Sequence, residues 1–365
     1  MTPQPQPLAF DALVGFADDD ALAAFVAFRD WARAAAAQTP PLSAAQATSP
    51  RLMRIAQAAC GASIADVGAA RRFFVENFRP WRAVSDAADG AAFFTGYYEP
   101  EIDASLKPTA DFRAPLLARP HDLVSFAPGE GPPALDRRLA GAQRRSDGSL
   151  APYPDRAAIE AGSGEAIAWL ADEVEVFFAQ VQGSARLRLT DGRKMRLIYD
   201  GRNGQPYTSI GRLLIEAGEI PLQEMSLARL KAWLRANGLK PGDKGRSLMQ
   251  RNASYVFFRL VEDVDPGLGP IGGAGIALTP LRSIAVDRTL WSYGLPFWID
   301  AALPWESDEL SPFRRLMVAH DTGSAIVGPA RADIFFGAGE AAGARAGAIR
   351  HRGAFAVLTP VGDEP

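Results

Sequence analysis

Two aspartates in the C-terminal part of the chain stand in contexts that suit acid chemistry. Asp321 lies in LMVAHDTGSAIVG, after an apolar run and before small residues, and Asp333 lies in RADIFFG. On a strand, Asp333 shares a face with Arg331 and Phe335, because alternate residues point to the same side. A carboxyl beside an aromatic ring in a partly dry groove has its ionised form disfavoured, so its pKa rises and it can act as a general acid near neutral pH. Arg331 opposes this rise if its side chain folds inward.

Spacing alone leaves other roles open for these aspartates. An aspartate beside glycines commonly lies in a turn and accepts hydrogen bonds from backbone N–H groups. The string DTGS at 321–324 also matches the active-site loop of aspartic proteases, in which two facing aspartates share one proton. A single chain needs two such loops, and the other Asp-Gly pairs lack the preceding strand and the hydroxyl residue. The aspartic protease therefore stays a distant alternative.

Other catalytic chemistries have little support in the sequence. The three histidines, His121, His320 and His351, show no ligand spacing, and the single Cys60 excludes a thiolate cluster, so we predict no bound metal and no cofactor. The stretch GAGEAAG at 337–343 resembles a dinucleotide fingerprint, but its third glycine comes one residue late, and we expect a turn there. Neither a GxSxG elbow nor a P-loop is present.

The elements that position these aspartates follow from hydrophobic periodicity. Residues 18–80 read as helical, with Pro80 at the end, and 91–100 (AAFFTGYYEP) read as a strand. Residues 100–154 hold nine prolines and the polar stretch GAQRRSDGSL, which favour irregular connections. Asp155 is a plausible N-cap for a short helix through Ala161.

The second half of the chain reads mainly as strands. The alternation in 174–201 predicts strands with turns at the DG pairs at 191 and 200. SLARLKAWLRANG, 226–238, predicts a helix that begins after Ser226 and stops at Gly238. From 253 onward, seven short β-prone runs, namely SYVFFRLV, GIALTPL, SIAVD, LPFWID, RLMVAHD, ADIFF and FAVLT, predict a small barrel or sandwich.

Composition limits the class of protein. The chain has 365 residues, 48% of them hydrophobic, which is enough for roughly two domains and excludes a disordered, collagen-like or disulfide-framed chain. The 39 Lys and Arg against 42 Asp and Glu leave a net charge of -3, without the basic surface that nucleic acid requires. No apolar run is long enough to cross a bilayer, and the first twenty residues lack a cationic region followed by an apolar stretch.

Taken together, segments from about 90 to 360 resemble the membrane-bound lytic transglycosylase A family, bacterial enzymes that cleave peptidoglycan glycan strands. The matching segments, in order, are FTGYYEP (94–100), YPDRAAIEAG (153–162), FFAQVQGSARL (177–187), YDGRNGQPYTSIGRLL (199–214), NASYVFFR (252–259), AVDRTLWSYG (285–294), AHDTGSAIVG (319–328) and RADIFFGAGEAAGARAG (331–347). The departures are Ser292 and Tyr293 in place of prolines, and GSAIVG in place of GGAIKG.

The resemblance implies a mainly β, α+β fold. Residues 1–100 and 263–365 would form a double-psi β-barrel domain with N-terminal helices, and its three-aspartate region would span 285–347. Residues 101–262 would form an inserted second β-barrel domain, with the glycan in a groove between the two barrels.

The resemblance also implies roles for individual residues. The last of three aspartates, Asp333, would be the catalytic acid, and Asp321 and Asp287 match the supporting pair. Asp333 would first protonate the glycosidic oxygen between MurNAc and GlcNAc, and would then accept the proton of the MurNAc C6 hydroxyl as it attacks C1. Further candidates for contacts to the sugars are Tyr97, Tyr98, Gln182, Ser184 and Gly323. The two tyrosines are equally well explained as barrel core.

The expected partner is therefore a peptidoglycan strand, bound by a monomer without nucleic acid and without a transmembrane segment. The expected location is the periplasm, with association to the outer membrane left open because no lipobox cysteine occurs. A catalytically silent peptidoglycan-binding module with the same fold is the main alternative to the enzyme.

Overall fold

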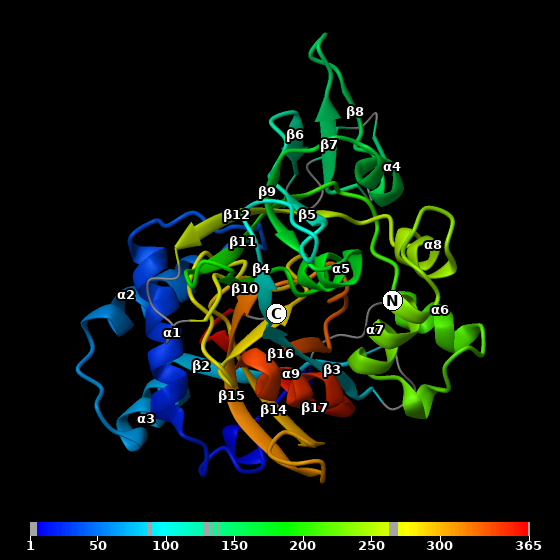
Figure 1. The fold of residues 1–365 in the computed structure, drawn as a ribbon. Helices are drawn as coiled ribbons and strands as arrows, with labels where there is room; N and C mark the ends of the chain where they lie inside the picture. Colours follow the sequence, from blue (N-terminus) through cyan, green and yellow to red (C-terminus); the bar gives the residue numbers. More distant parts are fainter. Residues whose placement is uncertain are drawn as a thin grey trace. The chain divides into compact units, whose positions relative to one another are not determined.

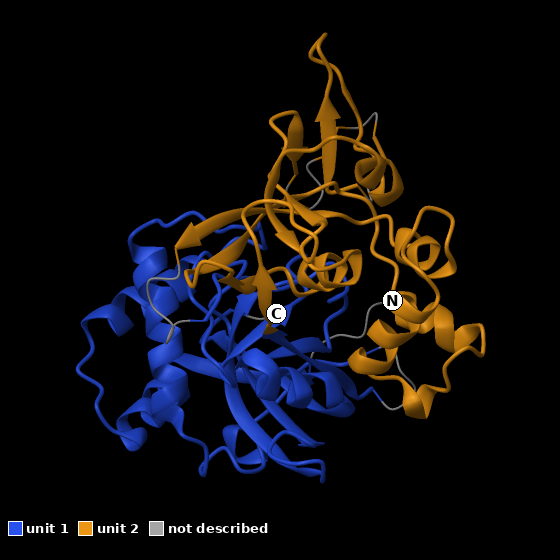
Figure 2. Cartoon of the chain, in the orientation of Figure 1, with its two compact units in different colours: residues 1–98, 267–365 blue, residues 99–266 orange. Residues whose placement is uncertain are grey.

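The computed structural model describes residues 6–85, 90–126, 131–132, 135–136, 139–262 and 269–363 (Figure 1). The chain divides into two compact units (Figure 2). Unit 1 consists of residues 1–98 and 267–365, and unit 2 consists of residues 99–266. The polypeptide therefore leaves unit 1 once, builds unit 2, and returns.

Unit 1 combines N-terminal helices with a sheet built from both of its chain segments. Its elements are β1 (Gln6–Pro7), η1 (Phe10–Ala12), α1 (Ala21–Ala36), α2 (Pro50–Gly61), α3 (Val67–Asn77), β2 (Phe78–Arg82), β3 (Ala92–Glu99), β13 (Ser283–Val286), β14 (Pro296–Leu303), β15 (Ser311–Asp321), β16 (Arg331–Ala338), α9 (Gly339–Ala348) and β17 (Arg350–Pro360).

The three N-terminal helices begin where the sequence supplies caps. The side chains of Asp20, Ser49 and Asp66 accept hydrogen bonds from the first turns of α1, α2 and α3. The predicted helical region is confirmed, although it ends at Asn77 and Pro80 lies within β2. Helix α1 packs against α2, α3 and β15.

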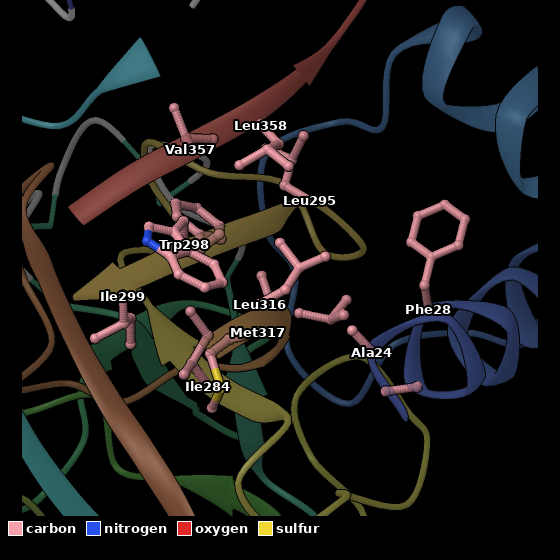
Figure 3. Close-up of a cluster of buried hydrophobic side chains, with 14 of the residues drawn as sticks. Ala24, Phe28, Ile284, Leu295, Trp298, Ile299, Leu316, Met317, Val357 and Leu358 are labelled. Atoms are coloured by element: carbon pink, nitrogen blue, oxygen red, sulfur yellow. The ribbon is translucent and has the colours of Figure 1, made fainter. Parts of the chain in front are cut away.

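Six strands of unit 1 close into a barrel. They follow the order β17-β14-β15-β13-β16-β3, and β3 pairs again with β17, while β2 and β1 extend the sheet outward from β17. A large buried core fills this unit, and Figure 3 shows part of it, with Trp298 and Ile299 of β14, Leu316 of β15, and Phe28 of α1. The predicted small barrel is thus present.

Unit 2 contains shorter strands and several helices. Its elements are β4 (Glu101–Ala104), β5 (Ala114–Leu117), β6 (Leu123–Ser125), β7 (Gly141–Arg144), β8 (Leu150–Pro152), α4 (Arg156–Ala161), β9 (Ala166–Leu170), α5 (Glu173–Gln182), β10 (Ala185–Leu189), β11 (Lys194–Arg202), α6 (Ile210–Glu216), η2 (Leu222–Glu224), α7 (Leu227–Ala236), α8 (Lys244–Gln250) and β12 (Val256–Glu262).

Six strands of unit 2 are also connected in a closed ring. The sheet β12-β11-β10-β4 and the pair β5-β9 are joined by two isolated bridges, Ser105 to Trp169 and Ala118 to Phe258. Apolar side chains from these strands form one buried cluster, and α5, α6, α7 and α8 contribute to a second. The strands β6, β7 and β8 form a separate three-stranded sheet.

Two predicted helices of unit 2 are confirmed at their caps. The Asp155 side chain accepts a hydrogen bond from the Ala158 N–H at the start of α4. Ser226 caps α7 in the same way, and Gly238 has a φ of +83° just beyond its end.

The predicted strand at the start of 174–201 is wrong, because Glu173–Gln182 forms helix α5. Val174, Phe177 and Phe178 face the helical cluster of unit 2, while Val176 and Ala179 face the strand cluster. A helix buried on two sides is apolar nearly all round, so its sequence loses the one-sided pattern of a surface helix.

Other local predictions in the strand-rich regions also need correction. The predicted turn at Asp200 is a bulge within β11, where Gly201 has a φ of +138°, although the turn at Asp191 is present. The polar stretch 141–150 is a hairpin between β7 and β8, rather than an irregular connection. GIALTPL forms only one isolated bridge, and SYVFFRLV contributes β12 to unit 2.

The turn predicted for GAGEAAG is a helix from Gly339 onward, because α9 continues to Ala348. Gly343 lies in this helix against the ring of Tyr98, where an added Cβ would approach to 2.7 Å. The glycine here serves a close helix-to-strand contact and not a turn.

Candidate active site

The register of the barrel places Asp321 and Asp333 on the same face. Strand β13 lies between β15 and β16, and its Ala285 pairs with Asp321 on one side and with Asp333 on the other. Side chains of directly paired residues point to the same side of a sheet. The two Cα atoms are therefore two strand spacings apart, roughly 10 Å.

Asp321 is held by three donors. Its Oδ1 accepts hydrogen bonds from the backbone N–H groups of Gly273 and Thr322, both at 2.8 Å, and its Oδ2 accepts one from the Tyr97 hydroxyl at 2.8 Å. Burial nevertheless raises the pKa of Asp321 to about 6, and the charge of Asp333 adds to this rise. Both oxygens of this carboxyl are thus already engaged.

Asp333 has a different arrangement of partners. Its Oδ1 accepts a hydrogen bond from the Thr95 hydroxyl at 2.5 Å. Its Oδ2 has no partner among the described residues, and it is not one of their fully buried polar atoms. Burial raises the pKa of Asp333, although the Arg331 charge and the Thr95 hydrogen bond both lower it. The free oxygen suits an exchange of protons with a bound molecule.

Tyr97, which donates to Asp321, packs against a second aromatic ring. The rings of Tyr97 and Phe335 are 5.3 Å apart, and both belong to a small buried cluster with Ala285 and Ile326. Burial and the two aspartate charges raise the pKa of the Tyr97 hydroxyl well above its ordinary value, so this group remains a donor.

Asp287 accepts a hydrogen bond from the loop that follows Asp321. Its Oδ2 accepts a hydrogen bond from the Gly328 N–H at 2.7 Å, and its Oδ1 accepts from the Thr289 N–H and hydroxyl. Asp287 is 5% exposed. It therefore ties two loops together and does not lie free in the site.

The two tyrosine candidates lie on opposite faces of β3. Tyr97 is 9% exposed and donates to Asp321, and Tyr98 packs against Gly343 of α9. The position of Tyr97 favours the barrel-core interpretation over a flat surface for a sugar ring.

The remaining candidates for sugar contacts divide between the units. Gln182 ends α5 and Ser184 follows it as a buried residue, and both belong to unit 2. Gly323 is exposed in the turn after β15, where its carbonyl accepts a hydrogen bond from the Ile326 N–H. Unit 1 therefore contains Asp333, Asp321, Asp287, Tyr97 and Gly323, whereas Gln182 and Ser184 belong to unit 2.

Sequence reasoning missed Thr95 and the backbone donor of Gly273. Thr95 stands two residues before Tyr97 on one strand, so period-two alternation would have placed both on one face. Nothing in the local sequence around Gly273 marks its N–H as a partner for Asp321.

His320 is buried in unit 1, next to Asp321 in the chain. It is 0% exposed, its Nδ1 is 2.8 Å from the Ser283 hydroxyl, and burial lowers its pKa to about 3. It is therefore a neutral core residue at physiological pH. Within the part of the chain that the structure describes, no group of three or more His, Cys, Asp or Glu side chains is placed to hold a metal ion.

Family models match both parts of this architecture. The MltA specific insert domain matches residues 93–259, and the 3D domain matches residues 282–359. The first match covers most of β3 and of unit 2. The second covers β15 and β16, which carry Asp321 and Asp333, and Asp287 directly after β13. Fold and site therefore define a barrel protein with a three-aspartate domain and an inserted domain.

The whole chain is similar to solved structures of the same class. A membrane-bound lytic murein transglycosylase from Agrobacterium tumefaciens is 34% identical, with a TM-score of 0.85 and 98% of each chain covered. MltA from Neisseria gonorrhoeae is 27% identical, with a TM-score of 0.74, over 99% of this chain and 94% of that one. The chain belongs to the membrane-bound lytic transglycosylase A (MltA) family.

A curated relative supports this assignment. "Membrane-bound lytic murein transglycosylase A" of Escherichia coli K12 is 31% identical over 74% of this chain. The match spans 66% of that relative, and 64% of the corresponding Vibrio cholerae protein, so it covers just under two thirds of their length. None of the helices in the described part of the chain is long and apolar enough to span a bilayer.

Proposed function

We propose that this protein is a peptidoglycan lytic transglycosylase that cleaves the bond between MurNAc and GlcNAc and leaves a 1,6-anhydromuramyl end. The names of the relatives support the reaction class. The E. coli MltA structure with bound chitohexaose, 26% identical with a TM-score of 0.65, supports an oligosaccharide ligand.

The mechanism rests on a difference between the two carboxyls: Asp333 has one oxygen without a hydrogen-bond partner among the described residues, and Asp321 has none. Asp333, protonated on its free Oδ2, donates to the glycosidic oxygen and becomes a carboxylate. The same carboxylate then takes the proton of the C6 hydroxyl as O6 attacks C1 of the same MurNAc. The nucleophile belongs to the substrate, so no bound water is needed and proximity supplies the advantage.

Asp321 and Asp287 act as positioning residues in this proposal. The three donors on Asp321 hold it in place, and its negative charge faces the positive charge that develops on the sugar. Glycosidases that hydrolyse use a second carboxylate as base or nucleophile. Asp321 is poorly suited to that task because both of its oxygens are occupied.

Other features of the proposal follow from family membership. They are a double-psi connection in the unit 1 barrel, a glycan groove between the barrels, sugar contacts from Gln182, Ser184, Tyr98 and Gly323, a monomeric state, and a periplasmic location with association to the outer membrane.

Digestion of purified sacculi in heavy-oxygen water tests the reaction class. Because water is not consumed, each new muramyl end should weigh one water less than a hydrolytic end, and it should resist borohydride reduction. Reducing muramic ends that carry the heavy oxygen would instead identify a hydrolase. Absence of any cleavage would favour the silent binding module.

A further inference from the structure

Thr95 lies between an arginine and the proposed catalytic acid. The Nη2 group of Arg331 donates a hydrogen bond to Thr95 Oγ1 at 2.7 Å, and Thr95 Oγ1 is 2.5 Å from Asp333 Oδ1. A guanidinium has only donors, so Thr95 must accept at the first contact. The single hydroxyl proton of Thr95 is then directed to Asp333.

Arg331 is itself fixed in orientation. Its Nη1 group donates to the backbone carbonyl of Ala332 at 2.5 Å and to that of Phe93 at 3.5 Å. Its guanidinium carbon also lies 5.4 Å from the centre of the Phe93 ring. Arg331 makes no ion pair with Asp333 in the structure, so its hydrogen-bonded connection to the acid runs through Thr95, in addition to the direct effect of its charge.

We propose that Thr95, oriented by Arg331, is a positioning residue that fixes the transferable proton of Asp333 on Oδ2. With Oδ1 occupied by a donor, a proton on that oxygen would displace the hydrogen bond, whereas a proton on Oδ2 leaves it intact. After transfer, the same hydrogen bond stabilises the carboxylate that must act as base. This inference rests on the proposed function only in that Asp333 is the acid.

The charged and titratable groups around Asp333 come from three strands. Arg331 lies on its own strand β16, Asp321 lies on β15, and Tyr97 lies on β3. Thr95→Val removes a hydroxyl, which is also an acceptor for Arg331, and changes none of these three charged or titratable groups. Thr95→Val is close in shape to threonine, and Thr95→Ser keeps the hydroxyl.

The pH profile of kcat/KM distinguishes positioning from packing. The alkaline limb of this profile reports the loss of the Asp333 proton. Without the Thr95 hydroxyl the Asp333 carboxylate is less stable, so the limb of Thr95→Val should move to higher pH by about one unit, a tenfold change in the proton dissociation constant. Thr95→Ser should keep the wild-type limb. Thr359→Val is the matched control and should not move the limb, because it removes from β17 a hydroxyl that donates to the Asp363 carbonyl.

Arg331→Lys tests whether the arginine acts through Thr95. The lysine keeps the positive charge but loses the planar fork that bonds both Thr95 and the backbone carbonyls. Arg331→Lys should move the limb in the same direction as Thr95→Val. In the Thr95→Val background it should add nothing, and additive shifts would contradict the relay.

Titration of the Asp333 carboxyl carbon by NMR gives a readout independent of activity. The signal is assigned by its loss in Asp333→Asn, and its pKa should be higher in Thr95→Val than in wild type or Thr95→Ser. Should Thr95→Val not fold, Thr95→Ala is titrated instead. An Asp333 pKa that is the same in Thr95→Val and in the wild type would overturn the inference. If the pKa does differ between them but the wild type makes no anhydromuramyl product, only the proposed function is overturned.

Discussion

The carboxyls of Asp333 and Asp321 are of the same chemical type but are prepared for different tasks. Asp333 has one bonded oxygen and one free oxygen, while both oxygens of Asp321 are bonded. Burial raises the pKa values of both carboxyls. Partner arrangement, and not burial alone, therefore separates the proposed acid from its support.

Asp333→Asn should leave a folded protein with almost no lytic activity. The amide keeps the shape and accepts from Thr95 but cannot transfer a proton, and loss of general acid-base catalysis costs roughly 100- to 10,000-fold in rate. Release of anhydromuropeptides from sacculi measures the loss, and circular dichroism checks the fold. Activity within a few-fold of wild type would remove Asp333 from the mechanism.

Asp321→Asn should change how stability depends on pH. The pKa of Asp321 is about 6 in the folded protein against an ordinary value of 3.8, so the folded state binds this proton more tightly. Its stabilising contribution is therefore complete below pH 3.8 and is lost as the pH rises through 6. Between these limits the wild type should lose at most about 3 kcal/mol of unfolding free energy relative to the variant.

Denaturant titrations of both proteins at intervals from pH 4 to 7 measure this difference. The asparagine variant should gain on the wild type as the pH rises, and the gain should level off above the folded pKa. Parallel stability curves would show that Asp321 titrates alike in the folded and unfolded states.

At the scale of elements, the tight packing of α1 against the barrel depends on a glycine. Gly294 lies before β14 with a φ of +84°, and a Cβ there would come 2.3 Å from the ring of Trp31. The backbone N–H of Gly294 also donates to the Ala319 carbonyl at 2.9 Å. This site therefore couples the helical region to the strand that carries Asp321.

Gly294→Ala should destabilise the protein strongly. A positive φ costs an alanine about 1 to 2 kcal/mol, and the collision with Trp31 adds about 1 to 3 kcal/mol. Gly148→Ala is the matched control, because its φ is +83° and nothing lies within 4 Å of the added Cβ. Thermal unfolding should show a clearly larger loss for Gly294→Ala, and equal losses would contradict the packing argument.

At the scale of the whole molecule, one chain builds two ring-closed sets of strands. Unit 2 is inserted between β3 and β13 of unit 1, and the proposed acid and its hydrogen-bond partners belong to unit 1. Protein side chains and the substrate hydroxyl suffice for the proposed reaction.

Chelation with EDTA should therefore leave lytic activity unchanged. The described residues contain no cluster of three or more metal-type ligands, and the proposed proton transfers use Asp333 alone. Activity on sacculi is compared before and after dialysis against the chelator. A loss that zinc or magnesium restores would reveal a metal site.

Much of this protein could be predicted from the sequence, where the signal is local. Capping residues such as Asp155 and Ser226 predict helix starts because a side chain bonds a backbone N–H only three residues away. Short β-prone runs predict the strands that carry Asp321 and Asp333, and the ordered motifs indicate the family. These features depend on neighbours in the chain.

Only the tertiary structure decided which groups meet. Thr95 and Asp333 are 238 residues apart in the chain, and Gly273 and Asp321 are 48 apart, so their hydrogen bonds depend on sheet register and leave no local pattern. The strand predicted at the position of helix α5 is wrong for a similar reason, because two separate clusters bury opposite faces of this helix. Long-range pairing determines the partners of each carboxyl, and those partners determine which oxygen is free.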